Sequence, residues 1–303
     1  MTLRIGTAEP SSTFLSQGEA LKVVLERNPT LVPVEVSPSP TASVQNAHRL
    51  NDGDIDFGFM AANWIGRAKS GEAPFAQKIE LRMVAPMNAG PLFFIARADS
   101  DLRNVTDLRG RRVVVGPQQS GMAQHARVIF GALGLAPSDL SPLYLDFAAG
   151  ADALARGEVD AQLQCPIPNK VMTALAERVL VRVLPYPPGD LEKVLHAVPV
   201  YRRTTMRKGA IRGLEADVAQ PAVVNVLVTH ARAPDDPVRQ VAAVVYGARE
   251  ELPRLIALFD GLAELFEPLR SEGARALEFG GVALHPGALA AYRAAGLLEA
   301  VAQ

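Results

Sequence analysis

The sequence has 303 residues, a formal net charge of −1 and 49% apolar residues, enough for two packed lobes of roughly 100–200 residues each. The near-neutral charge gives no electrostatic basis for binding nucleic acid or an anionic membrane surface, and no run of about 18 apolar residues is present to insert into a membrane. The single cysteine, Cys165, excludes an intrachain disulfide and a cysteine-based zinc site.

The first part of the chain alternates between strand and helix patterns. Pro29 ends the first helical pattern, and Pro33 marks the following strand as the edge of a sheet. Ser43 is expected to cap the second helix. The expected elements are a strand at 3–6, a helix at 14–27, a strand at 31–36, a helix at 43–50 and a strand at 55–60.

The alternation continues to about Leu184, which is typical of an α/β fold with mostly parallel sheets flanked by helices. Two apolar, strand-like runs, at 92–96 and 223–229, have the character of crossings between two lobes. They lead us to expect lobe one at 1–97 plus 223–303 and lobe two at 98–222. Further helices are expected in lobe one at 237–254 and 255–273.

One short pattern, Leu-x-x-Gly-acid-β-branched-Asp, occurs at 50–56 and again at 154–160. In each copy a glycine is expected to end a helix, because glycine tolerates the left-handed conformation of a helix stop. The β-branched residue is expected to begin a strand. Two similar lobes predict a clamshell that closes on a ligand held between them, driven by tighter binding to the closed state.

Three serine-led helix starts are the main candidates for ligand binding: Ser12-Thr13-Phe14, Ser43-Val44 and Ser120-Gly121-Met122. A helix N-terminus offers unpaired N–H groups and a partial positive charge that favour an anion. Ligands of open α/β sheets lie at the carboxyl ends of the strands, where these helices begin. The alternative is that the serines only cap helices.

Other residues expected near the cleft are Asn63, Trp64 and Cys165. Glu9 lies in the first of these loops, and an inward-facing carboxylate there would call for an amine-bearing ligand. The acids of the repeat are expected at turns and strand starts rather than in catalysis. The histidines are scattered without metal-ligand spacing, so no metal site is expected, and Met122 replaces the lysine of a phosphate loop.

With these residues in place, the chain resembles the TAXI family of solute-binding proteins of TRAP transporters, which have the type II periplasmic-binding-protein fold. The matching motifs are Ile5-Gly6-Thr7, Thr41-Ala42-Ser43-Val44-Gln45-Asn46, Arg97-Ala98-Asp99-Ser100, 107–112, 115–127, Tyr144-Leu145, 151–154, Pro168-Asn169 and Leu284-His285-Pro286-Gly287. The resemblance implies a closing receptor for a small organic acid, a TRAP membrane permease as partner and no cofactor. It places Thr13, Phe14, Ser43, Val44, Ser120, Gly121 and Met122 in the pocket, with Asn63 nearby.

Two departures from the family pattern bear on the ligand. The usually glycine-rich first loop reads Ala8-Glu9-Pro10 here, and Ala61-Ala62 replaces a polar pair at a strand end. The rival interpretation is a cytosolic enzyme, with Glu9 as general base and His125 or Cys165 opposite it, or a cytosolic ligand sensor. The lack of an acid–base or nucleophile constellation favours the receptor. A trimmed signal peptide would make the protein periplasmic, and a native start at Met1 would make it cytoplasmic.

Overall fold

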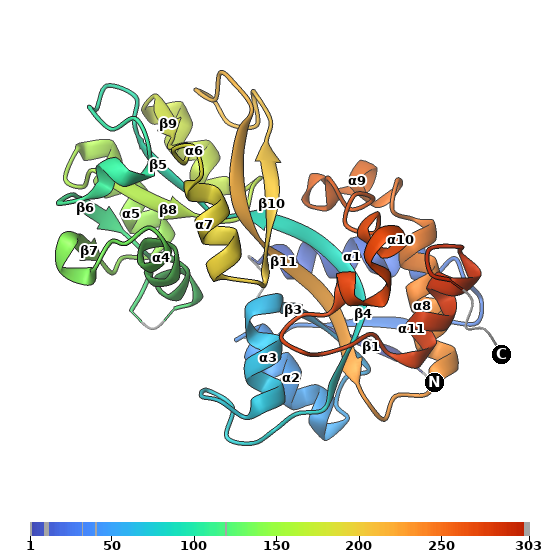
Figure 1. Ribbon diagram of the computed structural model, residues 1–303. Helices are drawn as coiled ribbons and strands as arrows, with labels where there is room; N and C mark the ends of the chain where they lie inside the picture. The colour runs from blue at the N-terminus through green and yellow to red at the C-terminus, as the bar shows by residue number, and fades with distance from the viewer. Residues whose placement is uncertain (1, 9–11, 32, 40, 119, 300–303) are drawn as a thin grey trace. The chain divides into compact units, whose positions relative to one another are not determined.

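The computed structural model confirms the α/β fold and describes residues 2–8, 12–31, 33–39, 41–118 and 120–299 (Figure 1). The chain forms two compact units. Unit 1 comprises Met1–Ala89 and Val224–Gln303, and unit 2 comprises Gly90–Val223. The chain passes between them inside two long strands, β4 (Leu81–Pro91) and β11 (Val218–His230).

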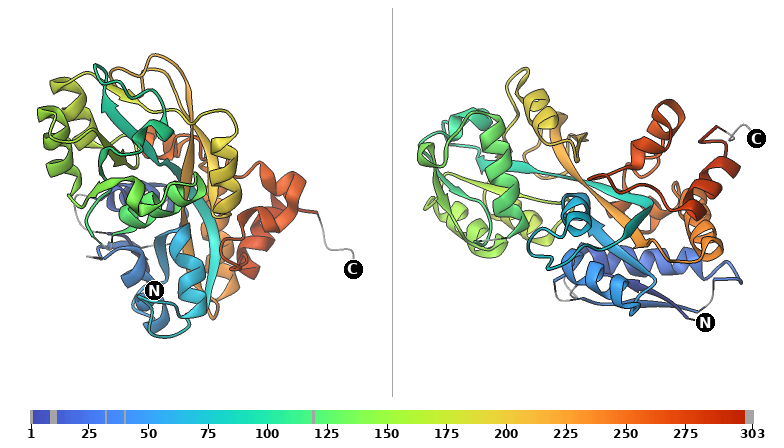
Figure 2. Two further views of the ribbon diagram at one scale, coloured as in Figure 1. Left: turned by 60° about the vertical axis from the view of Figure 1, so that its left-hand side comes forward. Right: turned by 60° about the horizontal axis from the view of Figure 1, so that its bottom comes forward.

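In unit 1, β1 is parallel to both β2 and β3, and the second half of β11 runs antiparallel to β3. β2 lies at the edge of the sheet, as Pro33 predicted. Each of these three parallel strands leads into a helix, and α2 and α3 lie side by side in every view (Figure 2). The elements are β1 (Leu3–Gly6), α1 (Thr13–Leu25), β2 (Val34–Ser37), α2 (Ser43–Asp52), β3 (Phe57–Ala61) and α3 (Ala62–Ser70).

The C-terminal part of unit 1 contains α8 (Asp235–Gly247) and α11 (Pro286–Ala294), which pack against each other. The single helix expected over 255–273 is wrong. The extended backbone of Ile256 ends the first short helix, and the structure has only brief turns there because Pro268 can start a helix but not continue one. The short helices are α9 (Leu252–Leu255) and α10 (Pro268–Glu272), with 3₁₀ turns at Ala257–Phe259 and Gly273–Leu277.

The sheet of unit 2 repeats the design of unit 1. β6 is parallel to β7 and β8, and β5 runs antiparallel to β8 and β9. β10 pairs with the first half of β11. The elements are β5 (Phe93–Arg97), β6 (Arg112–Val114), α4 (Gly121–Ala132), β7 (Ser141–Leu143), α5 (Phe147–Arg156), β8 (Ala161–Gln164), α6 (Lys170–Arg178), β9 (Val181–Val183), α7 (Asp190–Ala197) and β10 (Tyr201–Met206), with 3₁₀ turns at Val105–Leu108 and Pro137–Asp139.

The structure places β5 differently from the ranges expected for the lobes. The sequence analysis expected the run 92–96 to cross between the lobes and assigned all of 1–97 to lobe one. In the structure both edges of β5 pair with strands of unit 2, and β4 makes the crossing instead. The apolar pattern of β5 reflects burial on both faces of the sheet, because Phe93, Phe94, Ile95 and Ala96 are all fully buried.

The repeated motif behaves similarly in both units. Gly53 ends α2 and Gly157 ends α5, each in the left-handed conformation with φ of 79° and 74°. The strands begin at Phe57 and Ala161, two positions later than expected. The reason is that the aspartate before each strand uses its side chain to hold a neighbouring strand, as described below.

Each unit has its own apolar core. In unit 1, Ile5, Leu21, Phe59 and Tyr292 are fully buried, and the Tyr292 hydroxyl donates to the carbonyl of Val84 at 2.6 Å. Burial of each such side chain stabilises the fold by about 1.5–3 kcal/mol. The core of unit 2 gathers around residues that include Phe93, Val114, Leu154, Met172 and Leu175. Both cores lie between a sheet and its helices, so they fix the helix starts at the strand ends.

Candidate functional site

The helix starts of unit 1 lie at the carboxyl ends of its parallel strands, where the sequence placed candidate residues. Ser12 caps α1, and its Oγ accepts from the N–H of Phe14 at 3.2 Å. Thr13 is the first helical residue. Phe14 turns inward and stacks on Phe59, with 5.6 Å between ring centroids. Phe14 therefore belongs to the core, whereas Ser12 and Thr13 are half-buried at the helix start. Glu9 lies outside the described residues.

Ser43 does not cap α2, so this expectation is wrong. Ala42 occupies the N-cap position, with φ of 46°, and Ser43 is the first helical residue. The Ser43 hydroxyl accepts instead from the N–H of Ala61, at 3.0 Å, and so ties the start of α2 to the end of β3. Val44, next to it, packs against the core of unit 1. Ser43 therefore stabilises the start of α2 by bonding to the end of β3 rather than by capping the helix.

Sequence reasoning missed a buried chain of amides in unit 1. Gln17 of α1 and Asn225 of β11 both donate to Oδ1 of Asn88 in β4, each at 3.1 Å. All three side chains are buried. The Oε1 of Gln17 has no partner among the described residues, and neither has the Oγ1 of Thr7. The available signal was an asparagine within an apolar run of each of two strands.

Asn63 and Trp64 lie in the first turn of α3, directly after β3. Both amide atoms of Asn63 are buried without a partner in the described part of the chain. Trp64 meets Phe75 edge-on, with centroids 6.5 Å apart, and carries the Arg67 guanidinium over its ring at 5.4 Å. Asn63 thus retains unused hydrogen-bonding capacity, whereas the Trp64 ring is engaged in packing.

The start of α4 is the clearest anion-binding geometry in unit 2. Ser120 caps the helix and its Oγ accepts from the N–H of Ala123 at 3.1 Å. The N–H groups of Gly121 and Met122 have no intrahelical acceptor, and none is found among the described residues. Gly116 precedes this turn at φ of 90°, where a Cβ would lie 2.7 Å from the Cβ of Met122. A glycine is required for the loop to approach the helix this closely.

Cys165 follows β8, and its thiol lies 3.8 Å from the carbonyl oxygen of Gly90. Burial raises the pKa of this thiol to about 12, so it stays protonated at neutral pH and is not a nucleophile. His125, in α4, is hydrogen-bonded through Nδ1 to the hydroxyl of Tyr201 at 2.5 Å. The enzyme hypothesis placed His125 or Cys165 opposite Glu9. In the structure the histidine is hydrogen-bonded to Tyr201 and the thiol is protonated, and Glu9 lies outside the described residues.

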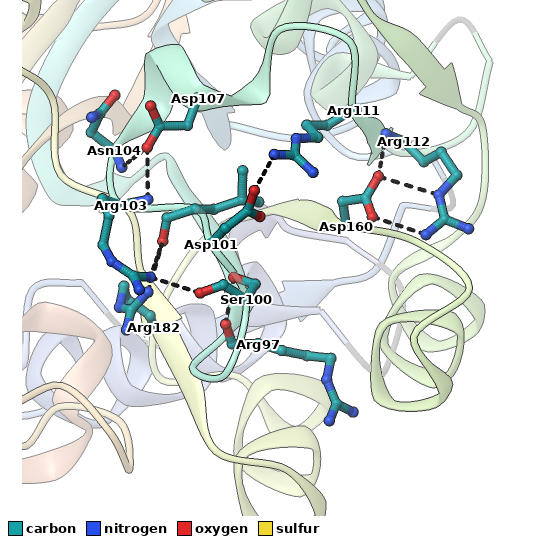
Figure 3. A network of polar contacts seen from close by, with 11 residues as sticks. Arg97, Ser100, Asp101, Arg103, Asn104, Asp107, Arg111, Arg112, Asp160 and Arg182 are labelled. Carbon is teal, nitrogen blue, oxygen red and sulfur yellow. Dashed lines mark hydrogen bonds and ion pairs between the residues drawn. The ribbon is translucent and has the colours of Figure 1, made fainter.

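The acids of the repeat hold strands together at the opposite, amino-terminal ends of the sheets. In unit 1 the Asp56 carboxylate accepts from the backbone N–H of Arg4 at 2.7 Å and from its guanidinium at 3.3 Å. In unit 2 Asp160 accepts from the N–H of Arg112 at 2.8 Å and from its guanidinium at 2.9 and 3.2 Å (Figure 3). These bonds from Arg112 hold the pKa of Asp160 below its usual range. Neither aspartate belongs to the candidate site.

The described ranges also bear on metal binding and on membrane spans. Within them, no group of three or more His, Cys, Asp or Glu side chains is placed to hold a metal ion. No helix there combines the length and the apolar character needed to cross a membrane.

A model of the NMT1-like family matches residues 5–296. The chain belongs to this family. The match covers both units and every helix start described above. Membership in the narrower TAXI family stays a prediction.

Solved structures show where else this fold occurs. The periplasmic aliphatic sulphonate binding protein SsuA from Escherichia coli is 20% identical over 86% of this chain and 75% of its own, with a TM-score of 0.51. A putative periplasmic sulfonate-binding protein from Methylobacillus flagellatus is 14% identical over 98% and 88%, with a TM-score of 0.57. A TctC solute binding protein from Polaromonas is 14% identical over 87% and 88%, with a TM-score of 0.55. At these identities the likeness establishes a shared fold.

Proposed function

We propose that this protein is a receptor that binds a small organic anion without changing it and passes it to a TRAP-type membrane permease. The start of α4 carries the proposal. There the N–H groups of Gly121 and Met122 have no acceptor among the described residues. The Ser120 hydroxyl already caps the N–H of Ala123, and Gly116 allows the loop to lie close to the helix. Such an array attracts a carboxylate or sulfonate through hydrogen bonds and the helix dipole.

The chemistry of unit 1 supports binding rather than catalysis. The buried polar side chains of its amide chain, Gln17, Asn88 and Asn225, are uncharged, and both amide atoms of Asn63 lack a partner among the described residues. Neutral amides orient a solute by hydrogen bonds and have no titratable proton to exchange with it. We propose that these amides can also donate hydrogen bonds to an organic anion, and that Glu9 selects an amine if its carboxylate reaches the solute.

The two sources of analogy favour different acids. The resemblance to TAXI proteins favours a carboxylate, such as a glutamate-like amino acid or an oxo acid. Two neighbours in fold are described as sulfonate-binding proteins. Both acid groups present several oxygens to N–H donors, so the same helix start suits either class. A screen must therefore contain both.

The test is calorimetric titration of the full chain with glutamate, 2-oxoglutarate and ethanesulfonate. We compare the wild type with Gly121→Pro and Gly121→Ala. Proline at the first helical position deletes one N–H but is well tolerated there, and the extended backbone of Ser120 (φ −71°, ψ 162°) suits a following proline. Alanine keeps the N–H, and a Cβ at Gly121 meets no atom within 4 Å.

We expect one of the acids to bind, Gly121→Pro to weaken it at least ~10-fold and Gly121→Ala to leave it nearly unchanged. The bound acid should be recovered chemically intact. Absence of binding by all three acids, or their conversion to a product, would overturn the proposal. Equal affinity of the proline variant and the wild type would remove the start of α4 from the site.

A further inference from the structure

The His125–Tyr201 pair lies beside the start of α4 and has no part in the function proposed so far. His125 is 7% exposed and Tyr201 is 3% exposed, and their rings lie 5.5 Å apart. The Nδ1 of His125 and the hydroxyl of Tyr201 are 2.5 Å apart. This contact joins the second turn of α4 to the first residue of β10, both in unit 2.

The partners of the two groups indicate which ring nitrogen of His125 carries the proton. The Tyr201 hydroxyl has no other acceptor among the described residues, and burial raises its pKa, so it keeps its proton and donates it to Nδ1. Nδ1 must then be the unprotonated nitrogen, which puts the ring hydrogen on Nε2. No partner for Nε2 is found in the described part of the chain. The ring therefore has one fixed acceptor and one unused donor.

Helix geometry directs the His125 side chain towards the end of α4 that carries the N–H groups of Gly121 and Met122. Residues four apart lie on the same face of a helix, so His125 shares a face with Gly121. Side chains on a helix also lean towards its N-terminus, so the surface covered by His125 lies over the first turn. A Cβ at Gly121 would meet no atom within 4 Å, so the imidazole leaves the space beside Gly121 open.

The surroundings keep the imidazole uncharged. Cys165 and Tyr186 are the titratable groups close enough to Tyr201 to influence it, and both are protonated because burial raises their pKa. No carboxylate partner of the His125 ring is found in the described ranges. Burial lowers the pKa of His125 to about 4. A neutral imidazole can still donate one hydrogen bond, and it does so without titrating near pH 7.

We propose that His125 is a further solute-recognition residue, whose Nε2–H, oriented by Tyr201, donates to an oxygen of the anion held at the start of α4. The inference rests on the proposed function, since it needs an anion at that helix start. Tyr201 is a positioning residue, because it contacts the histidine rather than the solute. The acid recognised must present more oxygens than the two N–H groups of the helix start engage, which a carboxylate or sulfonate does.

Two substitutions separate the nitrogens of the ring. In His125→Asn the amide oxygen stands at the position of Nδ1 and can still accept from Tyr201, but no donor reaches the position of Nε2. In His125→Gln the longer side chain brings its NH₂ group to about the position of Nε2. Tyr201→Phe removes the orienting hydroxyl and leaves the imidazole. All three full-length variants are checked for folding by thermal unfolding before titration with the acid of the panel that binds the wild type.

We expect His125→Asn to bind the acid about 10- to 100-fold more weakly, which is the loss of one hydrogen bond to a charged group. His125→Gln should recover most of the affinity, and Tyr201→Phe should lose several-fold. Wild-type affinity in a folded His125→Asn variant would overturn the inference. If Gly121→Pro still weakens binding in that case, the proposed function stands and only the role of His125 fails. If no acid binds the wild type, both fail together.

Discussion

At the scale of single residues, the repeated motif gives each unit a bracket of one arginine and one aspartate. Asp56 and Asp160 stand three residues after a glycine that ends a helix, and each accepts the backbone N–H and the guanidinium of an arginine on a parallel strand. The same guanidinium donates to the carbonyl of that glycine, Gly53 or Gly157, at 2.9 and 3.3 Å. One carboxylate thus fixes a helix end and a strand start together.

Removal of one charge from the bracket should therefore cost stability. We expect Asp56→Asn to lower the free energy of unfolding by about 1 kcal/mol, because part of the guanidinium and N–H bonding is lost while half-exposure screens the charges. Urea denaturation measures the change. Glu267→Gln is the control, since the exposed Glu267–Arg270 pair is 4.0 Å apart and should change stability by less than about 0.5 kcal/mol. Equal effects of the two substitutions would contradict the bracket.

His125 should make stability depend on pH. Its pKa is about 4 in the folded chain against an ordinary 6.5, since burial disfavours the charged ring. Between these values the unfolded chain binds the proton and the folded chain does not, so stability is complete above pH 6.5 and falls as the pH drops towards 4. The contribution is about 3 kcal/mol. Urea denaturation from pH 7.5 to 4 should show this fall in the wild type and a shallower one in His125→Asn. Parallel curves would contradict it.

At the scale of elements, two glycines should respond oppositely to alanine. Gly157 ends α5 at φ of 74° with no atom within 4 Å of an added Cβ, so Gly157→Ala should destabilise by about 1 kcal/mol through backbone strain alone. Gly131 lies within α4, exposed and equally open. Gly131→Ala should stabilise by roughly 0.5–1 kcal/mol, since alanine is the better helix former. Thermal unfolding of both variants measures the two changes in stability. Changes of the same sign in both variants would contradict the prediction.

The elements also show what local patterns can and cannot predict. The strand–helix alternation, the edge position of β2 and the glycine stops follow from proline, glycine and apolar spacing, and the sequence indicated all of them. The partner of the Ser43 hydroxyl could not be predicted, because Ala61 is distant in sequence and close only through the pairing of α2 with β3. The prediction of a single helix over 255–273 failed because apolar spacing alone does not show that Pro268 begins a separate short helix.

At the scale of the whole molecule, the limit of sequence reasoning was long-range pairing. The helix starts around Ser12, Ser43 and Ser120 were predicted because each is a local pattern after a strand. The amide chain of Gln17, Asn88 and Asn225 was not, because its members come from α1, β4 and β11 and meet only in the folded unit. Long-range pairing of strands also explains why β5 belongs to unit 2, where it pairs with β8 and β9.

The way the chain divides between the units predicts which fragments fold alone. Unit 2 is one continuous segment with its own core, and its ends meet, since the N–H of Leu92 donates to the carbonyl of Pro221 at 2.8 Å. The core of unit 1 needs both of its segments, because β11, α8 and α11 cover residues that come before Ala89. A fragment of 1–89 alone would leave that apolar surface exposed to water.

We therefore expect the fragment 90–223 to unfold cooperatively, with a stability within the roughly 5–15 kcal/mol of ordinary domains, and the fragment 1–89 to remain unfolded. Thermal unfolding followed by near-ultraviolet circular dichroism distinguishes them, because fixed aromatic packing gives a signal that a collapsed chain lacks. A fragment of 1–89 joined to 224–303 by a short glycine-serine linker should regain the signal, since Asn88 and Asn225 are already hydrogen-bonded across the joint. Folding of 1–89 alone would show that β11 and the C-terminal helices are dispensable to the first core.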